Sequence, residues 1–273
     1  MSDDIILKEM QHVLLDILVN IDRVCREHGL RYYLLSGTML GAVRHKGFIP
    51  WDDDADVALP RKDYNELMAH AKEWLPEDYE LVNYENSSDY PYAFARIQDR
   101  RTTYILRRHF NFVGGVPVDV FPLDGMTANK LMQHYLYRVR RILIKLSYYT
   151  QRDPYKHGHG PKSWPFLACR KLISSHWVSR QIERVESHYD FDKSPLVIDH
   201  DLHCQQGIQP KAVYGTPTPA MFEGHTFLGM ADPDAYLRHV YGNYMEPPAV
   251  MPPCNYRYMD LHTPYREYLK SHK

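Results

Sequence analysis

The chain has 273 residues, of which 44% are hydrophobic and 25% are charged. This composition is typical of a globular protein and excludes an intrinsically disordered chain. The sequence contains no run of about 18 uncharged apolar residues, which excludes a membrane-spanning helix. The four cysteines form no C-x-x-C pair, so a reducing, cytoplasmic setting is the expected location.

The formal net charge of −1 hides an asymmetric distribution. Residues 127–184 contain twelve Lys and Arg against two acidic residues and carry +10, whereas the remainder carries −11. A solvated charged face is the simplest interpretation. Contact with an anionic membrane surface is favoured instead, because basic residues accompany Tyr, Leu and Ile in this stretch. No recognised nucleic-acid-binding motif accompanies the charge, so no nucleic-acid partner is expected.

The first 126 residues predict a mixture of helices and strands. Apolar residues recur at helical spacing over residues 5–28, and a second amphipathic pattern covers residues 61–74. Strands are expected at 31–35, 56–59, 79–84, 93–97 and 116–121, with a brief helix at 38–44. These elements predict an α+β fold in which residues 1–126 form a core around a mixed sheet.

The remainder divides into two further parts. Residues 127–189 predict a helical insertion with helices at 131–149 and 164–188, joined by a loop rich in Pro, Gly and His. Residues 190–273 contain clustered prolines and predict a loop-rich part that packs on the core, with one helix at 233–241. The tract 199–204 has metal-ligand residue types, but it lacks a second ligand pair and is interpreted as a polar loop.

The stretch 35–57 contains a candidate phosphate site. Small residues between a strand and a helix start let a phosphate approach backbone N–H groups, and the helix dipole favours its negative charge. Basic residues after the helix are well placed for phosphate oxygens. The residues expected at this site are Ser36, Gly37, Thr38, Arg44, His45 and Lys46.

The same stretch ends in a cluster of aspartates. Asp54 and Asp56 lie two residues apart at the start of a strand, so their carboxylates share a face and can bind one hard cation. The carboxylates of this cluster repel one another unless a cation neutralises them. The alternative interpretation is an acidic turn exposed to solvent. Asp119 is the candidate third carboxylate, because an unpaired charge inside the apolar strand 116–121 is costly. Asp124 is expected to cap the turn that follows.

These segments resemble the LicD family. Residues 37–56 match its longest motif, which runs from a Gly-Thr pair to Ile-Pro-Trp-Asp-Asp-Asp-x-Asp, and residues 94–102, 118–125 and 236–248 are similar to its other motifs. The resemblance implies a nucleotidyltransferase-like core, a CDP-alcohol donor and a glycan or lipid-linked glycan acceptor. The implied reaction moves phosphocholine from CDP-choline to a sugar hydroxyl, by a protein that is cytoplasmic or peripheral to the inner face of the cell membrane.

The resemblance also implies residue roles. The implied ligands of Mg²⁺ or Mn²⁺, one ion or two, are Asp54, Asp56 and Asp119, with Asp52 as a possible helper. Asp119 is also the candidate general base, and Arg44, Lys46 and Arg96 would neutralise charge on the phosphoryl oxygens. Trp51 is the candidate aromatic residue for binding choline, unless it simply packs under the acidic turn.

Three alternatives stay open. Nucleotidyl transfer uses the same carboxylates but releases pyrophosphate rather than CMP. Transfer of ribitol phosphate or glycerol phosphate requires only a different donor. A non-catalytic glycan-binding relative is the third alternative, although a binding protein gains nothing from a repulsive aspartate cluster.

Overall fold

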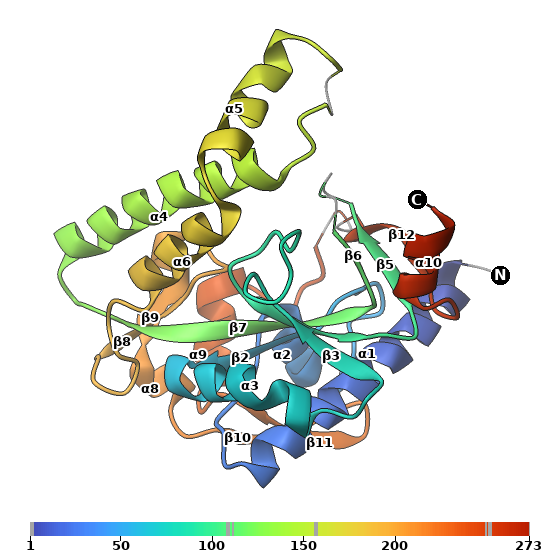
Figure 1. The fold of residues 1–273 in the computed structure, drawn as a ribbon. Coiled ribbons are helices and arrows are strands. Elements are labelled where there is room, and N and C mark those ends of the chain that lie inside the picture. The colour runs from blue at the N-terminus through green and yellow to red at the C-terminus, as the bar shows by residue number, and fades with distance from the viewer. Residues whose placement is uncertain are drawn as a thin grey trace.

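The computed structural model describes residues 3–107, 110, 112–155, 158–248, 250 and 253–272. Its centre is a mixed sheet (Figure 1). Along this sheet the strands follow the order β1 (Tyr33–Leu34), β2 (Asp56–Pro60), β7 (Pro117–Met126), β4 (Ala95–Asp99) and β3 (Tyr79–Val82). Strands β2 and β7 run parallel, whereas β4 is antiparallel to both β7 and β3. The expected α+β class with a mixed sheet is confirmed.

The C-terminal part of the chain adds to this sheet. Strand β8 (Leu196–Asp199) pairs antiparallel with the second half of β7, and β9 (Ile208–Pro210) pairs with β8. Residues 190–273 therefore contain more regular structure than the loop-rich interpretation allowed. Among the clustered prolines, Pro219 lies within the strand Thr218–Phe222, whereas Pro247, Pro248 and Pro253 lie outside helices and strands. Short helices α7 (Cys204–Gly207) and α8 (Lys211–Tyr214) flank β9.

Helices cover the sheet and enclose the main apolar core. The observed helices are α1 (Asp3–Glu27), α2 (Ser36–Arg44), α3 (Arg61–Trp74) and α9 (Pro233–Tyr241), close to the predicted ranges. Gly29 adopts a φ of +66° just after α1, which explains why the helix ends there. The predicted stripe on α1 is buried from Met10 onward, including Leu14 and Ile17, whereas Leu7 is half-buried. None of the described helices combines the length and the apolar character needed to cross a membrane.

Two small sheets were not predicted. Strands β10 (Thr218–Phe222) and β11 (His225–Gly229) form a hairpin, and β12 (Tyr256–Asp260), β5 (Thr103–Leu106) and β6 (Val113–Gly114) form a second sheet. The second sheet brings the C-terminal segment, including α10 (Tyr265–Ser271), beside the middle of the chain. Strands this short leave little periodicity in the sequence, and β12 pairs with β5 about 150 residues away.

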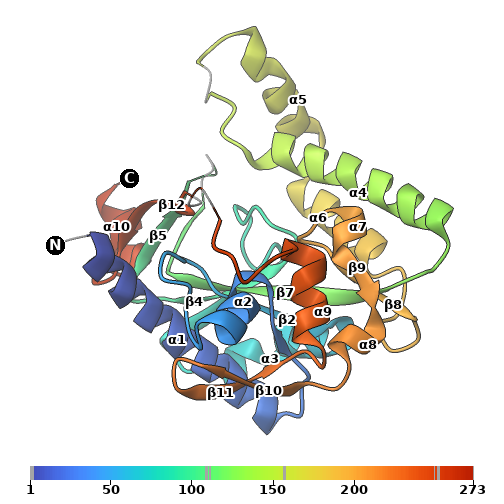
Figure 2. The same ribbon diagram turned by 180° about the vertical axis from the view of Figure 1, so that it is seen from behind.

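We call α4, α5 and α6 the helical arm. Its helices are α4 (Lys130–Gln151), α5 (Trp164–Leu172) and α6 (Ser175–Glu186), with a short 3₁₀ turn at Pro161–Ser163. In both views α5 projects away from the body of the molecule (Figures 1 and 2). The single helix predicted at 164–188 is wrong, because Ile173 is extended and the Ser174 side chain accepts the Trp177 N–H to begin α6.

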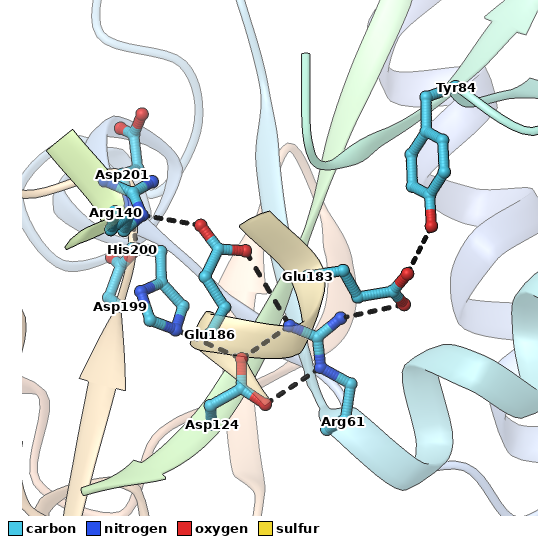
Figure 3. A network of polar contacts seen from close by, with 9 residues as sticks. All are labelled: Arg61, Tyr84, Asp124, Arg140, Glu183, Glu186, Asp199, His200 and Asp201. Carbon is cyan, nitrogen blue, oxygen red and sulfur yellow. Dashed lines mark hydrogen bonds and ion pairs between the residues drawn. The ribbon is translucent and has the colours of Figure 1, made fainter. Parts of the chain in front are cut away.

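A buried ionic network joins the arm to the sheet (Figure 3). Arg61, at the start of α3, donates two hydrogen bonds to Asp124, at 2.8 and 2.5 Å. The guanidinium of Arg61 also lies 3.9 Å from Glu186 of α6, whose other oxygen accepts a 2.6 Å hydrogen bond from Arg140 of α4. Nε2 of His200 lies 3.1 Å from Asp124. A small apolar cluster, Met126, Leu136, Ile198 and Ile208, packs beside this network.

The position of Asp124 corrects its expected role as a turn cap. Asp124 is fully buried within β7. Burial alone would raise the pKa of its carboxyl group, but the charge and hydrogen bonds of Arg61, together with His200, lower that pKa to about 2. The sequence did not reveal this role, because the partner charges come from residues 61, 140, 186 and 200.

Asp124→Asn is expected to lower the free energy of unfolding by about 3–5 kcal/mol, since it leaves Arg61 buried beside a neutral partner. Urea titration measures this loss. The contribution of Asp124 is present above about pH 4, the unfolded value, and is lost as the pH falls toward the folded pKa of about 2. Asp78→Asn, which breaks an exposed 2.9 Å pair with Arg101, is the control and should cost less than about 1 kcal/mol. Equal losses in the two variants would contradict this account.

Candidate active site

A cavity of about 440 Å³ lies between the central sheet and the helical arm. Its size is that of a typical small-molecule site. The charged and non-aromatic polar residues that line it are Asp53, Asp54, Asp56, Arg96, Asp119, Arg140, Ser147, Glu186, His200, Asp201 and Asn255. Three of the four predicted metal ligands, Asp54, Asp56 and Asp119, therefore face one space.

The parallel pairing of β2 with β7 brings these carboxylates together. Asp56 is the register partner of Asp119, and Asp54 lies two residues before Asp56. Burial and the charges of its neighbours raise the pKa of Asp56 well above its usual range, with Asp54 and Asp119 the strongest of these charges. The pKa of Asp54 is also raised, first by burial and then by the charges of Asp52 and Asp119. The cluster thus holds more negative charge than its protein surroundings compensate.

Arg96 compensates one member of the cluster. It is the register partner of Asp119 on the opposite side of β7, and its Nε lies 2.6 Å from Asp119 Oδ1 while Nη2 donates a 3.0 Å hydrogen bond to Oδ2. Burial still raises the pKa of Asp119, although the charge of Arg96 opposes that shift. Within the described part of the chain, no three His, Cys, Asp or Glu side chains are already arranged as a metal-binding group.

The predicted phosphate-binding residues of α2 do not line this cavity. Thr38 is buried, and its hydroxyl accepts the backbone N–H of Asp56 at 2.8 Å, so it fixes the start of β2. Ser36 has a φ of 45°, and its N–H donates to the Tyr236 hydroxyl at 3.2 Å. A Cβ on Gly37 would lie 3.1 Å from Asp52 Oδ2, so the glycine permits this carboxylate to approach the helix N-terminus. Their role in binding phosphate stays a prediction.

The predicted basic residues also lie outside the lining of the cavity. Arg44 donates a 2.6 Å hydrogen bond to the Tyr244 carbonyl, and it lowers the pKa of the neighbouring His45 after the larger effect of burial. His45 and Lys46 are exposed, and Lys46 adopts a φ of 61°. The ring centroids of Trp51 and His45 lie 6.5 Å apart in an edge-on arrangement, and Trp51 also packs against the main core. These contacts favour a packing role for Trp51 over choline binding.

The acidic turn is held by the C-terminal segment. The backbone N–H of Asn255 donates to Asp53 at 2.6 Å, and its side-chain amide donates to Asp53 at 2.9 Å and to Asp54 at 2.8 Å. Burial raises the pKa of Asp52 to about 6, while a hydrogen bond with Asp54 and the charge of Arg44 act in the opposite direction. Asp52 therefore interacts with the cluster through Asp54 and does not itself line the cavity.

Sequence reasoning missed part of the lining. The tract 199–204 was interpreted as a polar loop, but His200 is buried and both His200 and Asp201 line the cavity. The charge of Asp201 contributes to the raised pKa of Asp56. Residues 200–203 form a loop, as expected, but a test for a zinc pattern alone could not reveal that Asp201 shares a cavity with Asp54 and Asp56, more than 140 positions earlier. Asn255 carried no sequence signal at all.

The chain is similar in sequence to known proteins. Residues 29–150 match the family model described as LicD/FKTN/FKRP, nucleotidyltransferase domain. Lipopolysaccharide cholinephosphotransferase LicD of Haemophilus influenzae is 29% identical over 251 residues, which cover 89% of this chain and 92% of that protein. An uncharacterized protein of Rickettsia typhi is 34% identical over 164 residues, 56% of this chain and 51% of that protein.

These similarities support a transferase of phosphate-containing groups. The expected resemblance is confirmed, because residues 29–150 match the LicD family model. This domain contains Asp54, Asp56, Arg96 and Asp119, whereas Asp201 and Asn255 lie beyond it. The cavity is therefore completed by parts of the chain outside the matched domain.

Asp56→Asn is expected to raise the melting temperature in EDTA, because it removes one charge from a buried, mutually repulsive group. A relief of 1 kcal/mol corresponds to roughly 2–4 °C for a protein of about this size. Asp53→Asn should instead lower the melting temperature, because the Asp53 carboxylate accepts two hydrogen bonds from Asn255. Differential scanning calorimetry in EDTA separates the two outcomes. A lower melting temperature for Asp56→Asn would contradict the repulsion account.

Proposed function

We propose that this protein transfers phosphocholine from CDP-choline to a sugar hydroxyl of a cell-surface glycan or its lipid-linked precursor. The observation that carries the proposal is the convergence of Asp54, Asp56 and Asp119 on one cavity of substrate size. The similarity to the Haemophilus influenzae protein extends over most of both chains, which supports a shared donor and a related acceptor.

We also propose that the reaction requires Mg²⁺ or Mn²⁺. The donor set fits a hard cation, because carboxylate oxygens are its preferred ligands and the raised pKa values of Asp54 and Asp56 reflect repulsion that a cation would relieve. Asp54, Asp56 and Asp119 would hold the ion, with Asp52 behind Asp54. When bound, the ion would stabilise charge on the departing CMP and acidify the acceptor hydroxyl.

The protein groups have separate tasks around the phosphoryl group. Arg96 holds Asp119 in place and supplies positive charge to the cavity wall, where it can neutralise phosphoryl oxygens. Burial raises the pKa of Asp119, which suits it to accept the proton of the acceptor hydroxyl at a carboxylate oxygen. Arg140, on α4, offers a second guanidinium at the far wall. Arg44, His45 and Lys46 would act only on parts of the donor outside this cavity.

Asp54→Asn is expected to abolish transfer, because the cluster loses one of its proposed metal ligands. The protein should stay folded, because no buried positively charged donor loses its partner. Wild-type protein should show a higher melting temperature with Mg²⁺, and the variant should lose this shift, since a ligand stabilises the state that binds it. Asp78→Asn, far from the cavity, should retain both properties. Full activity of Asp54→Asn, or no Mg²⁺ shift in the wild type, would contradict the assignment.

Identifying the released nucleotide product and the preferred donor separates the alternatives. Release of CMP supports transfer of a phospho-alcohol, whereas release of pyrophosphate from a nucleoside triphosphate would support nucleotidyl transfer. Use of CDP-ribitol or CDP-glycerol in preference to CDP-choline would support a polyol-phosphate transferase. Binding of a glycan without turnover of any donor would support a non-catalytic protein.

The helical arm is the proposed contact with an anionic membrane surface at which a lipid-linked acceptor resides. Its described apolar side chains are unusually exposed, including Trp164 at 66%, Leu172 at 79% and Ile142 at 68%. Exposed basic residues surround them: Arg138, Arg141, Lys145, Lys162, Arg170, Lys171, Arg180 and Arg184. Basic charge with exposed Trp and Leu is the combination that binds an interfacial, anionic surface. This arrangement supports peripheral attachment at the inner face of the membrane.

The double variant Trp164→Ser and Leu172→Ser tests the membrane contact. Wild-type protein is expected to float with vesicles that contain anionic phosphatidylglycerol but not with pure phosphatidylcholine vesicles. The variant should lose most of this flotation, and so should the wild type in high salt. Met245→Ser, which removes a side chain 57% exposed outside the arm, is the control. Equal flotation of wild type and double variant would contradict the proposal.

A further inference from the structure

The cavity has an aromatic side that the metal and phosphate chemistry does not use. We define the aromatic wall as Tyr92, Phe94, Phe110 and Phe121, all of which line the cavity. Phe94 and Phe121 lie with ring centroids 4.3 Å apart, and Phe94 stacks on Tyr92 at 4.8 Å. Phe110 meets Tyr92 nearly at right angles, with centroids 6.0 Å apart. The wall thus presents rings in more than one orientation to the same space.

Strand register places this wall beside the carboxylates. Arg96 of β4 is opposite Asp119 of β7, and Ala95 is opposite Val120, so Phe94 and Phe121 form the next pair on the same face. Same-face neighbours on a strand are separated by roughly 7 Å. A group bound at Asp119 and a group bound at Phe121 are therefore one same-face step apart. Phosphocholine has a comparable span, since only a two-carbon linker separates its phosphate from its ammonium group.

The chemistry of the wall selects a cation. Aromatic faces attract positive charge, and the wall already lies against one, because the Arg96 guanidinium sits 4.7 Å from the Tyr92 centroid and 5.9 Å from that of Phe94. The carboxylates of Asp54, Asp56 and Asp119 share the cavity and add a negative potential. Phe94, Phe110 and Phe121 have no hydrogen-bonding group, so the hydroxyls of a polyol would lose their water partners there.

We propose that the aromatic wall binds the quaternary ammonium group of the transferred phospho-alcohol and so selects choline over polyols. The inference rests on the proposed function and deepens it by assigning the residues that recognise the donor. Phe94 and Phe121 form the centre of the proposed choline site, because they are adjacent to the position proposed for the reacting phosphate. Phe110 and Tyr92 form one side of this site. Trp51, the candidate suggested by the sequence, lies outside the cavity lining.

The test compares CDP-choline with the CDP ester of 3,3-dimethylbutanol, in which a carbon atom replaces the nitrogen and the charge is lost without a change of shape. Isothermal titration calorimetry with Mg²⁺ measures both dissociation constants. The wild type is expected to bind CDP-choline about 5- to 30-fold more tightly, the range for a desolvated cation–π site. Phe94→Leu and Phe121→Leu should each reduce this preference, while their affinities for CMP stay unchanged.

Phe112→Leu is the matched control, because Phe112 is a buried ring next to Tyr90 that does not line the cavity. It should keep the wild-type preference. Equal affinities of the wild type for the charged and neutral esters, or an unchanged preference in both wall variants, would overturn the aromatic wall as the choline site while leaving the transfer reaction standing. Failure of the wild type to bind CMP or any CDP ester would overturn the proposed function, and this inference with it.

Discussion

The parallel pairing of β2 with β7 is the constraint on which the site depends. It sets Asp56 opposite Asp119, and the strand geometry then places Asp54 on the same side. A parallel pair cannot be closed by a tight turn, so a long crossover is required; here residues 61–116 supply it with α3, β3, β4, β5 and β6. That crossover also inserts β4 against the other edge of β7, which delivers Arg96 to Asp119. One topological requirement thus supplies both the negative cluster and its buried counter-charge.

The site is assembled from distant parts of the chain by a few polar contacts. Arg44 reaches the Tyr244 carbonyl, and Asn255 holds the turn that carries Asp53 and Asp54. The N–H of Ser36 donates to Tyr236. These contacts join the first segment that resembles the LicD family to the last one. The residues of that first segment outside the cavity therefore have a structural role that is independent of any ligand: they orient the strand that presents the carboxylates.

Local patterns in the sequence predicted what local physics determines. The helices at 61–74 and 233–241 were predicted with their observed bounds, because their apolar spacing and flanking prolines act within one segment. The aspartate cluster was recognisable because its repulsion is evident in the sequence itself. Asp124 was misjudged, since its environment depends on Arg61 and His200, and burial cannot be read from its neighbours in the chain. The break at Ser174 was also missed, although the Ser-Ser pair is a favourable helix start.

The aromatic residues also show that proximity in the sequence does not reveal which side chains share a site. Trp51 was prominent in the sequence because it adjoins the acidic motif. In the structure, however, its side chain lies against His45 and the core. Phe94 and Phe121 are separated by 27 positions and come together only through the register of β4 and β7. A residue's distance from the reacting centre is thus set by strand pairing, and strand pairing is the information that composition and periodicity do not contain.

The helical arm connects the cavity with the exterior. Along α4, Arg140, Ile144, Ser147 and Tyr148 follow helical spacing and line the cavity, whereas Leu131, Tyr135 and Ile142 are exposed. Glu186 of α6 closes the same wall and is fixed by Arg140. Because one helix forms the wall of the cavity with one face and exposes apolar and basic side chains with another, whatever surface the arm contacts also lies beside the site. A lipid-linked acceptor bound at that surface would need only a short path to the carboxylates, so the proposed attachment and the proposed substrate delivery would depend on the same element.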